Sequence, residues 1–178
     1  MTPLPLRYKY LNYEPAPKML LEMLKLYGIE ELLGPGDNPV IMNWSKEVQA
    51  KGYTNDAIAW CGLGMAIAAK RGGWDYQPNG NALWARNWAK WGTPQKVAML
   101  GDVLVFARGA GGHVTMYVGE DKSYYHCLGA NQSDMINITR KAKTPIIAIR
   151  RAPWKRLQPS NVRRIMLGAS GPIAGKES

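Results

Sequence analysis

The sequence changes its repeat pattern near its middle, and this change constrains the possible folds more than any other feature. Up to residue 92, apolar side chains recur at helical spacing. From residue 101 onward, short runs rich in β-branched and aromatic residues follow one another about every ten residues. Because the links between these runs are too short for helical crossovers, we expect an antiparallel sheet. Helices that precede such strands indicate an α+β fold, with the helices packed on one face of the sheet.

Residues that start and stop helices divide the first half into four predicted helices, at 17–28, 38–52, 54–71 and 81–91. In the second of these, Asn38 is a typical N-cap and Pro39 occupies the first helical position. The third begins at three capping-type residues, 54–56, and carries many Ala and Gly residues. Small side chains let two elements approach closely, so we expect this helix to pack tightly against a neighbour.

The second half predicts strands at 101–108, 113–120, 123–128, 135–140 and 145–150. Their spacing favours an antiparallel meander, in a sheet of five to six strands. We expect one domain over residues 17–153, between an N-terminal arm at 1–16 and a basic tail at 154–178. The tail is rich in Gly, Ser and Pro, and we expect no more than one or two helical turns there, around 162–167.

The composition excludes several classes of protein. The chain has 178 residues, of which 46% are hydrophobic and 20% charged, which is typical of one globular domain. Two Cys and two His residues are too few for a disulfide scaffold or for several metal sites. The short motifs of metal sites and phosphate-binding loops are missing, so we expect no metal and no cofactor. The chain has no apolar run that would span a membrane and no recognisable signal peptide, and we expect a monomer.

The formal charge of +10 lies mostly in the second half, and part of it is concentrated near the C-terminus. The basic residues of that part are Arg150, Arg151, Lys155, Arg156, Arg163 and Arg164. Such a surplus favours a polyanionic partner: nucleic acid, anionic lipid or an acidic wall polymer. The alternative explanation of this charge surplus is a solvated basic face that only keeps the protein soluble. The aromatic and basic residues form no recognisable nucleic-acid-binding motif, so we expect no nucleic-acid partner.

Three residues far apart in the sequence have the chemistry of a nucleophilic site. Cys61 lies near the start of the third predicted helix, where the helix dipole stabilises a thiolate; a small core residue is the alternative. His113 begins a predicted strand just after the glycine-rich link GAGG. Asn131 directly follows another strand, where its carboxamide can accept the imidazole N–H, although an Asn in such a segment is usually a turn former.

Two further sets of residues are open to more than one interpretation. His126 and Cys127 are adjacent on a strand and point to opposite faces, so we expect them to be structural, with His126 also lining a cleft. Trp74, Trp84, Trp88 and Trp91 lie around a polar loop, where they form either part of the core or the floor of a groove.

Several segments together resemble the papain-like cell-wall hydrolases, in particular the CHAP group and the NlpC-type peptidases of bacteriophages and prophages. The similar segments are 38–44, 55–68, 80–92, 101–106, 112–121 and 128–134, in unbroken order within about residues 18–153. The resemblance implies a papain-like fold, with Cys61 as nucleophile, His113 as general base and Asn131 as the orienting residue. The chain departs from the family pattern at Gly129, where many relatives have Glu, and at Gly62, where Ala or Ser is common.

The same resemblance implies that the protein is a peptidoglycan hydrolase that cuts an amide bond of the peptide stem, as an amidase or an endopeptidase. The expected role is that of a phage endolysin, made in the host cytoplasm and acting in the periplasm or cell wall. The alternatives are a virion-associated or secreted-effector hydrolase, and a catalytically silent binding or structural module with the same fold. We expect the substrate groove to be lined by Asp56, Trp60, Asn81, Trp84, Arg86 and His126. The basic tail would contact an anionic wall polymer or lipid.

Overall fold

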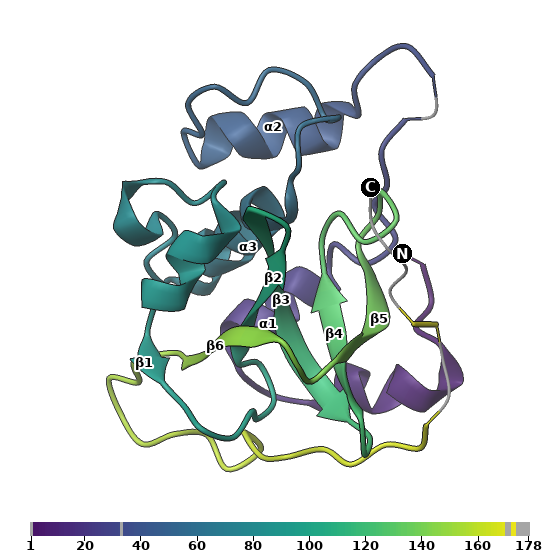
Figure 1. Ribbon diagram of the computed structural model, residues 1–178, viewed down its shortest axis with the longest axis vertical. Helices are drawn as coiled ribbons and strands as arrows, with labels where there is room; N and C mark the ends of the chain where they lie inside the picture. The colour runs from purple at the N-terminus through teal and green to yellow at the C-terminus, as the bar shows by residue number, and fades with distance from the viewer. Residues whose placement is uncertain (1, 33, 170–171, 174–178) are drawn as a thin grey trace.

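The second half of the chain forms a six-stranded antiparallel sheet with the strand order β1-β6-β2-β3-β4-β5 (Figure 1). A computed structural model describes residues 2–32, 34–169 and 172–173. The strands are β1 (Thr93–Pro94), β2 (Val103–Arg108), β3 (Gly111–Glu120), β4 (Tyr124–Gly129), β5 (Asn137–Ala142) and β6 (Ile146–Arg151). The predicted α+β class and antiparallel sheet are confirmed, and all five predicted strands are present.

The strand order differs from a simple meander at its last step. Strands β2 to β5 follow one another as predicted, but β6 pairs with β2 at the other side of the sheet. This pairing sets Ile149 opposite Leu104, and both belong to a small buried apolar cluster with Phe106, Tyr117 and others. Strand β1, which pairs with β6, was not predicted, because its two residues are too few to show a period.

The helices are α1 (Lys18–Leu24), α2 (Pro39–Glu47) and α3 (Cys61–Gly72), with the 3-10 helices η1 (Leu6–Tyr13), η2 (Pro78–Gly80) and η3 (Ala85–Lys90). Helices α1 and α3 lie against one face of the sheet, and α2 lies beyond α3 at one end of the molecule (Figure 1). The predicted cap of α2 is confirmed, since Asn38 Oδ1 accepts a hydrogen bond from Val40 N at 2.8 Å. No helix within the described ranges has the length and apolar character needed to cross a membrane.

Helix α3 begins later than predicted, which places Cys61 at its first position. The predicted start at 54–56 is wrong, because Asp56 is hydrogen-bonded to residues 37 and 38, just before α2. Asp56 accepts a hydrogen bond from Asn38 N at 2.7 Å, and Asp56 N donates to Asp37 Oδ1 at 2.9 Å. The side chain of Asp56 therefore braces the start of α2 instead of capping α3.

Both terminal segments pack on the domain. The 3-10 helix η1 buries Tyr8 and Leu11 in the core. At the other end, Leu100 N donates to Arg163 O at 3.0 Å, and Glu120 N donates to Ile165 O at 2.8 Å. The predicted helical turns at 162–167 are absent, and this stretch runs extended along the sheet. Residues 170–171 and 174–178 of the predicted tail lie outside the described residues.

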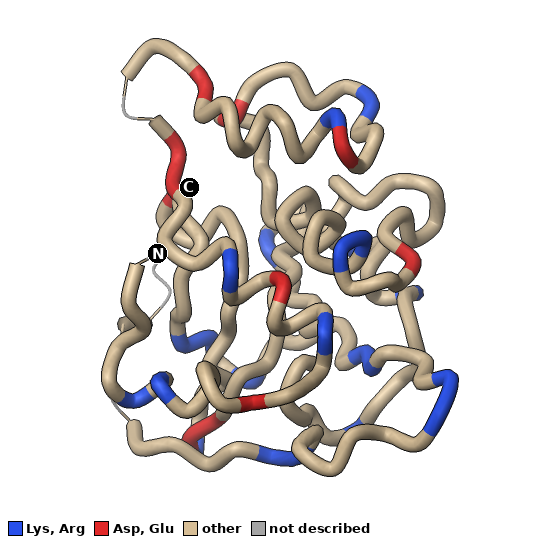
Figure 2. Tube along the Cα trace, turned by 180° about the vertical axis from the view of Figure 1, so that it is seen from behind, with Lys and Arg blue, Asp and Glu red and all other residues tan. Residues whose placement is uncertain are grey.

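Most of the basic residues near the C-terminus have partners inside the domain, and acidic positions lie among the basic ones along the trace (Figure 2). Arg163 pairs with Glu14 at 2.9 Å and Arg164 pairs with Glu120 at 2.7 Å. Arg151 is buried and pairs with Asp102 at 2.7 Å. Arg150 donates to the backbone oxygens of residues 91 and 92, while residues 155 and 156 are exposed. Within the described residues, the part of the predicted tail that carries Arg163 and Arg164 therefore packs on the domain.

Candidate active site

Cys61 lies at the first position of α3 and lines a pocket of about 200 Å³. The thiol side chain is largely enclosed, because the residue exposes only 3% of its surface. The pocket is also lined by Ala59, Leu83, Trp84, Ala85, Arg108, Gly111 and Gly112. The last two of these immediately precede His113 in β3. The structure therefore brings the start of α3 and the start of β3 to the same pocket, although they are far apart in the sequence.

Two glycines allow the first turn of α3 to approach its neighbours. A Cβ atom on Gly62 would lie 2.2 Å from the carbonyl oxygen of Ala82, and one on Gly64 would lie 2.4 Å from the Cβ of Ala130. Such distances exclude any side chain at either position without a shift of the backbone. The start of α3 thus sits between the segment at 82–83 and the loop that follows β4. This close approach explains why glycine occupies position 62.

His113 is the third residue of β3 and exposes only 2% of its surface. The glycine link before it is held by Arg86 of η3, whose Nε donates to Gly111 O at 2.7 Å and whose Nη2 donates to Gly109 O at 3.4 Å. Arg86 thus fixes the backbone that leads to His113. Its side chain is exposed, and its contact with substrate stays a prediction.

The amide group that contacts the imidazole belongs to Gln132. Its Oε1 lies 3.3 Å from His113 Nε2, and both side chains are buried. The prediction that Asn131 orients the imidazole is thus corrected by one position. Asn131 has a φ of 53°, in the left-handed region where Asn is a frequent turn residue. The chain turns at Asn131, and the following side chain enters the site.

Hydrogen bonds fix which way round the Gln132 carboxamide lies. Its Nε2 donates to Cys127 O at 3.2 Å, Asn137 O at 2.9 Å and Asn137 Oδ1 at 3.0 Å. Its Oε1 accepts from Thr139 Oγ1 at 3.1 Å. Because Oε1 is only an acceptor, the proton of a neutral His113 imidazole lies on Nε2, and Nδ1 carries the lone pair.

The environment of His113 keeps the imidazole neutral. Burial lowers the pKa of His113 to about 3, and the positive charges of Lys141 and Arg108 act in the same direction. The hydrogen bond to Gln132 opposes this shift but is the weaker effect. At neutral pH the imidazole is therefore a proton acceptor and not an imidazolium ion.

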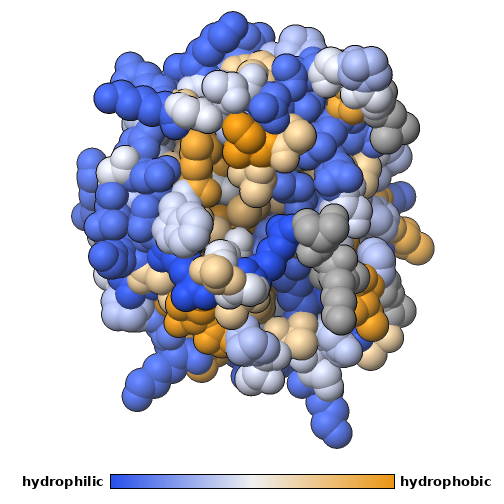
Figure 3. Space-filling model, turned by 45° about the horizontal axis from the view of Figure 1, so that its top comes forward, coloured by the Kyte–Doolittle hydropathy of each residue, from blue (hydrophilic) through white to orange (hydrophobic). Residues whose placement is uncertain are grey.

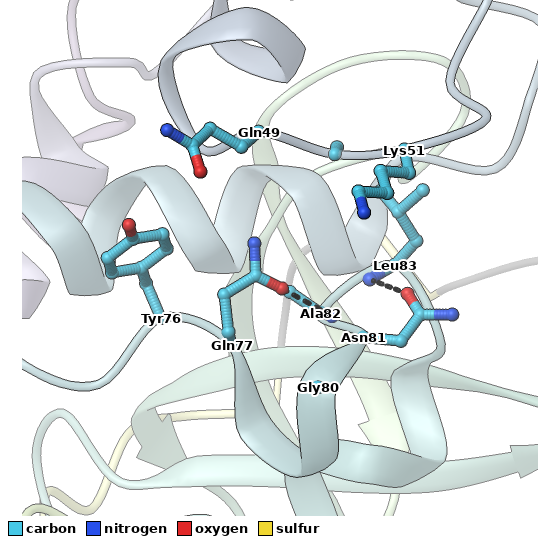
Figure 4. Close-up of a pocket in the computed structure, with 9 residues that line it drawn as sticks. Gln49, Lys51, Tyr76, Gln77, Gly80, Asn81, Ala82 and Leu83 are labelled. Atoms are coloured by element: carbon cyan, nitrogen blue, oxygen red, sulfur yellow. Dashed lines mark hydrogen bonds between the residues drawn. The ribbon is translucent and has the colours of Figure 1, made fainter.

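Two of the predicted substrate residues line pockets. Trp84 exposes 48% of its surface and lines the Cys61 pocket. Asn81 lines a neighbouring pocket of about 350 Å³, where its Oδ1 accepts a hydrogen bond from Leu83 N at 3.0 Å (Figure 4). The side of the molecule that carries α2 shows a hollow with an apolar floor and a hydrophilic rim (Figure 3).

The other predicted substrate residues are buried in structural networks, and these predictions are corrected. Trp60 is fully buried, packs against Trp44 and donates from its Nε1 to Glu31. His126 is fully buried between Tyr8 Oη at 2.7 Å and Asp121 Oδ2 at 3.1 Å. Asp56, as described above, braces the loop before α2.

Cys127, Trp88 and Trp91 belong to the interior, and Trp74 is half-buried. Cys127 is fully buried in the small apolar cluster on the sheet. Trp88 and Trp91 are buried, and their indole nitrogens donate to backbone oxygens. Trp74 packs edge-on against Trp154. Of the four tryptophans around the polar loop, Trp84 therefore presents its side chain to the Cys61 pocket.

Within the described ranges, no three His, Cys, Asp or Glu side chains gather closely enough to hold a metal ion. Comparisons of the chain with protein-family models, curated proteins and solved structures find no match. The chemistry of the site therefore rests on the geometry of its own residues.

Proposed function

We propose that this protein is a papain-like cysteine hydrolase that cleaves an amide bond of the peptidoglycan peptide stem. Cys61 is the nucleophile, His113 the general base and Gln132 the residue that orients the imidazole. The observation that carries the proposal is the hydrogen bond between Gln132 Oε1 and His113 Nε2, at the end of β3 that borders the Cys61 pocket. The family resemblance of the sequence supplies the substrate class.

The reaction follows from the protonation state of the imidazole. His113 Nδ1 takes the thiol proton as the sulfur attacks the carbonyl carbon, and the C–O π electrons move onto oxygen. The backbone N–H of Cys61, at the start of α3, donates to this oxyanion, an interaction worth about 3 kcal/mol. The C–N bond then breaks, and His113 gives its proton to the leaving amine. Water, deprotonated by His113, hydrolyses the thioester and releases the acid and the thiol.

The low pKa of His113 gives this mechanism a particular form. Because the imidazole is neutral at rest, it carries no positive charge that would hold a preformed thiolate. The thiolate therefore forms during the attack, when the substrate carbonyl takes up the negative charge. This differs from a site in which an imidazolium ion holds a preformed thiolate.

Burial of the site favours a second candidate function, a binding or structural module that has kept the fold without the reaction. Cys61 and His113 expose 3% and 2% of their surfaces, so a substrate carbonyl reaches the sulfur only through the pocket beside Trp84. A module of this kind would act on cells equally well without the thiol.

Mass spectrometry of purified peptidoglycan after digestion separates these functions. Wild-type protein is expected to release fragments with a new amine, whose position distinguishes an amidase from an endopeptidase. Cys61→Ser and His113→Ala are expected to release none. Cys127→Ser is the matched control, because Cys127 is the other cysteine of the chain and lies in the apolar cluster. Thermal melts monitored by circular dichroism verify that each variant is folded.

Two results would contradict the proposal. The first is the absence of new amines with folded wild-type protein. The second is unchanged digestion by Cys61→Ser. Lysis by wild type and by Cys61→Ser to the same extent, without bond cleavage, would support the binding module. An endolysin is the first expected role, and a virion-associated or secreted-effector hydrolase is the alternative.

A further inference from the structure

The Cys61 pocket is the first of three adjoining pockets. It shares Leu83 with the neighbouring pocket that contains Asn81. This second pocket shares Gln49, Ala50 and Lys51 with a third, which lies along α2. Figure 4 shows Lys51 and Leu83 next to each other above Asn81, between the loop after α2 and the segment at 80–83. We call the three pockets together the groove. It runs from Cys61 over Leu83 to the loop after α2.

The charges along the groove have one sign. Its charged lining residues are Arg108, Lys51 and Lys46, and among the described residues no Asp or Glu lines any of the three pockets. Glu47 of α2 is held by Arg71 of α3, with Nη2–Oε2 at 2.8 Å. A groove lined only by cations and neutral groups favours an anionic ligand.

The second pocket offers polar groups in fixed positions. Gln77 is held by its Nε2, which donates to Val48 O at 2.6 Å. Asn81 uses its Oδ1 to accept from Leu83 N, so its Nδ2 group is left as a donor for a ligand. Lys51 is exposed, and none of the described residues forms an ion pair with it. The ammonium of Lys51 and the amide of Asn81, which both line this pocket, are therefore donors suited to a carboxylate.

We propose that the groove binds a carboxylate-bearing part of the substrate, with Lys51 and Asn81 as the residues that select it. This inference rests on the proposed function, because it places the cleaved amide at Cys61 and the acidic group beyond Leu83. The substrate class is then an acidic peptide with a free carboxylate next to the cleaved bond. A peptide whose carboxylates are converted to amides binds more weakly, because the charge of Lys51 has no counterpart.

Binding is measured with Cys61→Ala protein by isothermal titration calorimetry, so that no cleavage occurs. The probes are the stem tripeptide L-alanyl-γ-D-glutamyl-L-lysine with free carboxylates and the same tripeptide with carboxamides. We expect the free form to bind about tenfold more tightly, the size of one charge-assisted hydrogen bond. Lys51→Gln in the same background is expected to abolish this preference, and Asn81→Ala to reduce it. Lys122→Gln, an exposed lysine in the turn after β3, is the matched control and keeps it.

The possible results distinguish an error in the proposed carboxylate binding from an error in the proposed hydrolysis. Equal affinity for the two tripeptides, a preference that survives Lys51→Gln, or no measurable binding of either tripeptide would overturn the inference. If wild type leaves peptidoglycan intact while the Lys51-dependent preference is present, the proposed reaction is wrong and the groove is a binding site. If Cys61-dependent cleavage occurs without the preference, only the groove inference is wrong.

Discussion

Gln132 is the residue on which the geometry of His113 depends most directly. Its carboxamide is itself held on both sides, by Thr139 at Oε1 and by Cys127 and Asn137 at Nε2. A carboxamide fixed in this way can present only its oxygen to the imidazole, which sets the tautomer of His113. Gln132 is thus a positioning residue in the proposed reaction, since it acts through His113 and does not touch the substrate.

Gln132→Ala is expected to lower kcat on peptidoglycan by about 10- to 100-fold, with a smaller effect on KM, because the imidazole loses its fixed tautomer. It also removes the acceptor of Thr139 Oγ1 and the donor to Cys127 O. That loss costs about 1–3 kcal/mol of unfolding free energy. Steady-state kinetics, corrected for the folded fraction from denaturation curves, separates the two effects.

Asn131→Gly is the control for this prediction. Glycine adopts the φ of 53° found at Asn131, so the turn is preserved while the carboxamide is removed. We expect its kcat to stay close to that of wild type. A large loss in Asn131→Gly together with normal activity in Gln132→Ala would return the orienting role to Asn131.

The one-residue difference between Asn131 and Gln132 marks the limit of prediction at this scale. The sequence correctly indicates that a polar side chain after β4 meets a histidine at the start of β3. Which of two adjacent amides does so depends on the φ of Asn131, a property of the turn that the residue types do not determine. The residue types also do not reveal that Trp60 and Asp56 are buried away from the site. That placement depends on their hydrogen bonds to Glu31 and Asn38.

At the scale of elements, the decisive contact is the approach of α3 to the loop after β4. Gly64 faces Ala130, and Gln132 follows two positions later. The distance between Cys61 and the orienting residue therefore depends on how closely this helix and this loop pack. The abundance of small residues in α3 predicted close packing, but not its partner, because that contact spans more than sixty positions.

A double-mutant cycle tests this contact. Gly64→Ala places a methyl group 2.4 Å from the Cβ of Ala130, so we expect it to lower the unfolding free energy by about 1–3 kcal/mol and to reduce kcat. Ala130→Gly removes the opposing methyl group. In the double variant the two changes compensate. Its loss of unfolding free energy is therefore expected to be smaller than the sum of the two single losses, and the difference should be similar in size to the clash energy. Urea denaturation of the four proteins measures it.

Purely additive effects in this cycle would contradict the role of the Gly64–Ala130 contact. A gain in stability from Gly64→Ala alone would also contradict it, because alanine favours a helix over glycine by only about 1 kcal/mol, which cannot offset the clash.

The sequence predicted the positions of the strands better than it predicted which strands pair with each other. Each predicted strand lies within a few residues of the observed one, because its content of β-branched and aromatic residues is a property of the segment itself. The pairing of β6 with β2 depends instead on side chains brought together by the whole sheet, such as Ile149 and Leu104. The path of residues 154–169 likewise depends on the backbone of Leu100 and Glu120, which lack any local relation to it.

At the scale of the whole molecule, the two terminal segments hold each other. Asn161 Nδ2 donates to Glu14 Oε2 at 2.8 Å and to Ala16 O at 2.6 Å, and Arg163 pairs with the same glutamate. Arg163 is thus part of a contact between the N-terminal and C-terminal segments. This favours a structural role for Arg163 over the predicted contact with an anionic polymer.

Asn161→Ala is expected to lower the unfolding free energy by about 1–2 kcal/mol, because it removes two hydrogen bonds and leaves Ala16 O without that donor. Asn12→Ala, an exposed asparagine in the N-terminal segment, is the matched control and is expected to change stability by less than about 0.5 kcal/mol. Chemical denaturation measures both. Equal stabilities of the two variants would show that the terminal segments do not support each other.

Burial of a neutral histidine also gives the whole protein a defined response to acid. The pKa of His113 is lowered from 6.5 to about 3 on folding, chiefly by burial. Between these values the unfolded chain binds a proton at His113 that the folded protein does not bind. Stability must therefore fall as the pH falls, by up to about 1.4 kcal/mol per pH unit from this group, whereas above 6.5 the group contributes no pH dependence.

His113→Gln removes this proton site, and its unfolding free energy is compared with that of wild type at several pH values. Other titrating groups, including His126, are common to both proteins and cancel in the difference. At pH 5 the wild type is expected to have lost about 2 kcal/mol more than the variant, relative to pH 7.5. A difference that is constant from pH 7.5 to 5 would mean that His113 takes up its proton in the folded state. In that case burial does not lower the pKa of His113, and the imidazole becomes an imidazolium ion below pH 6.5 in the folded protein.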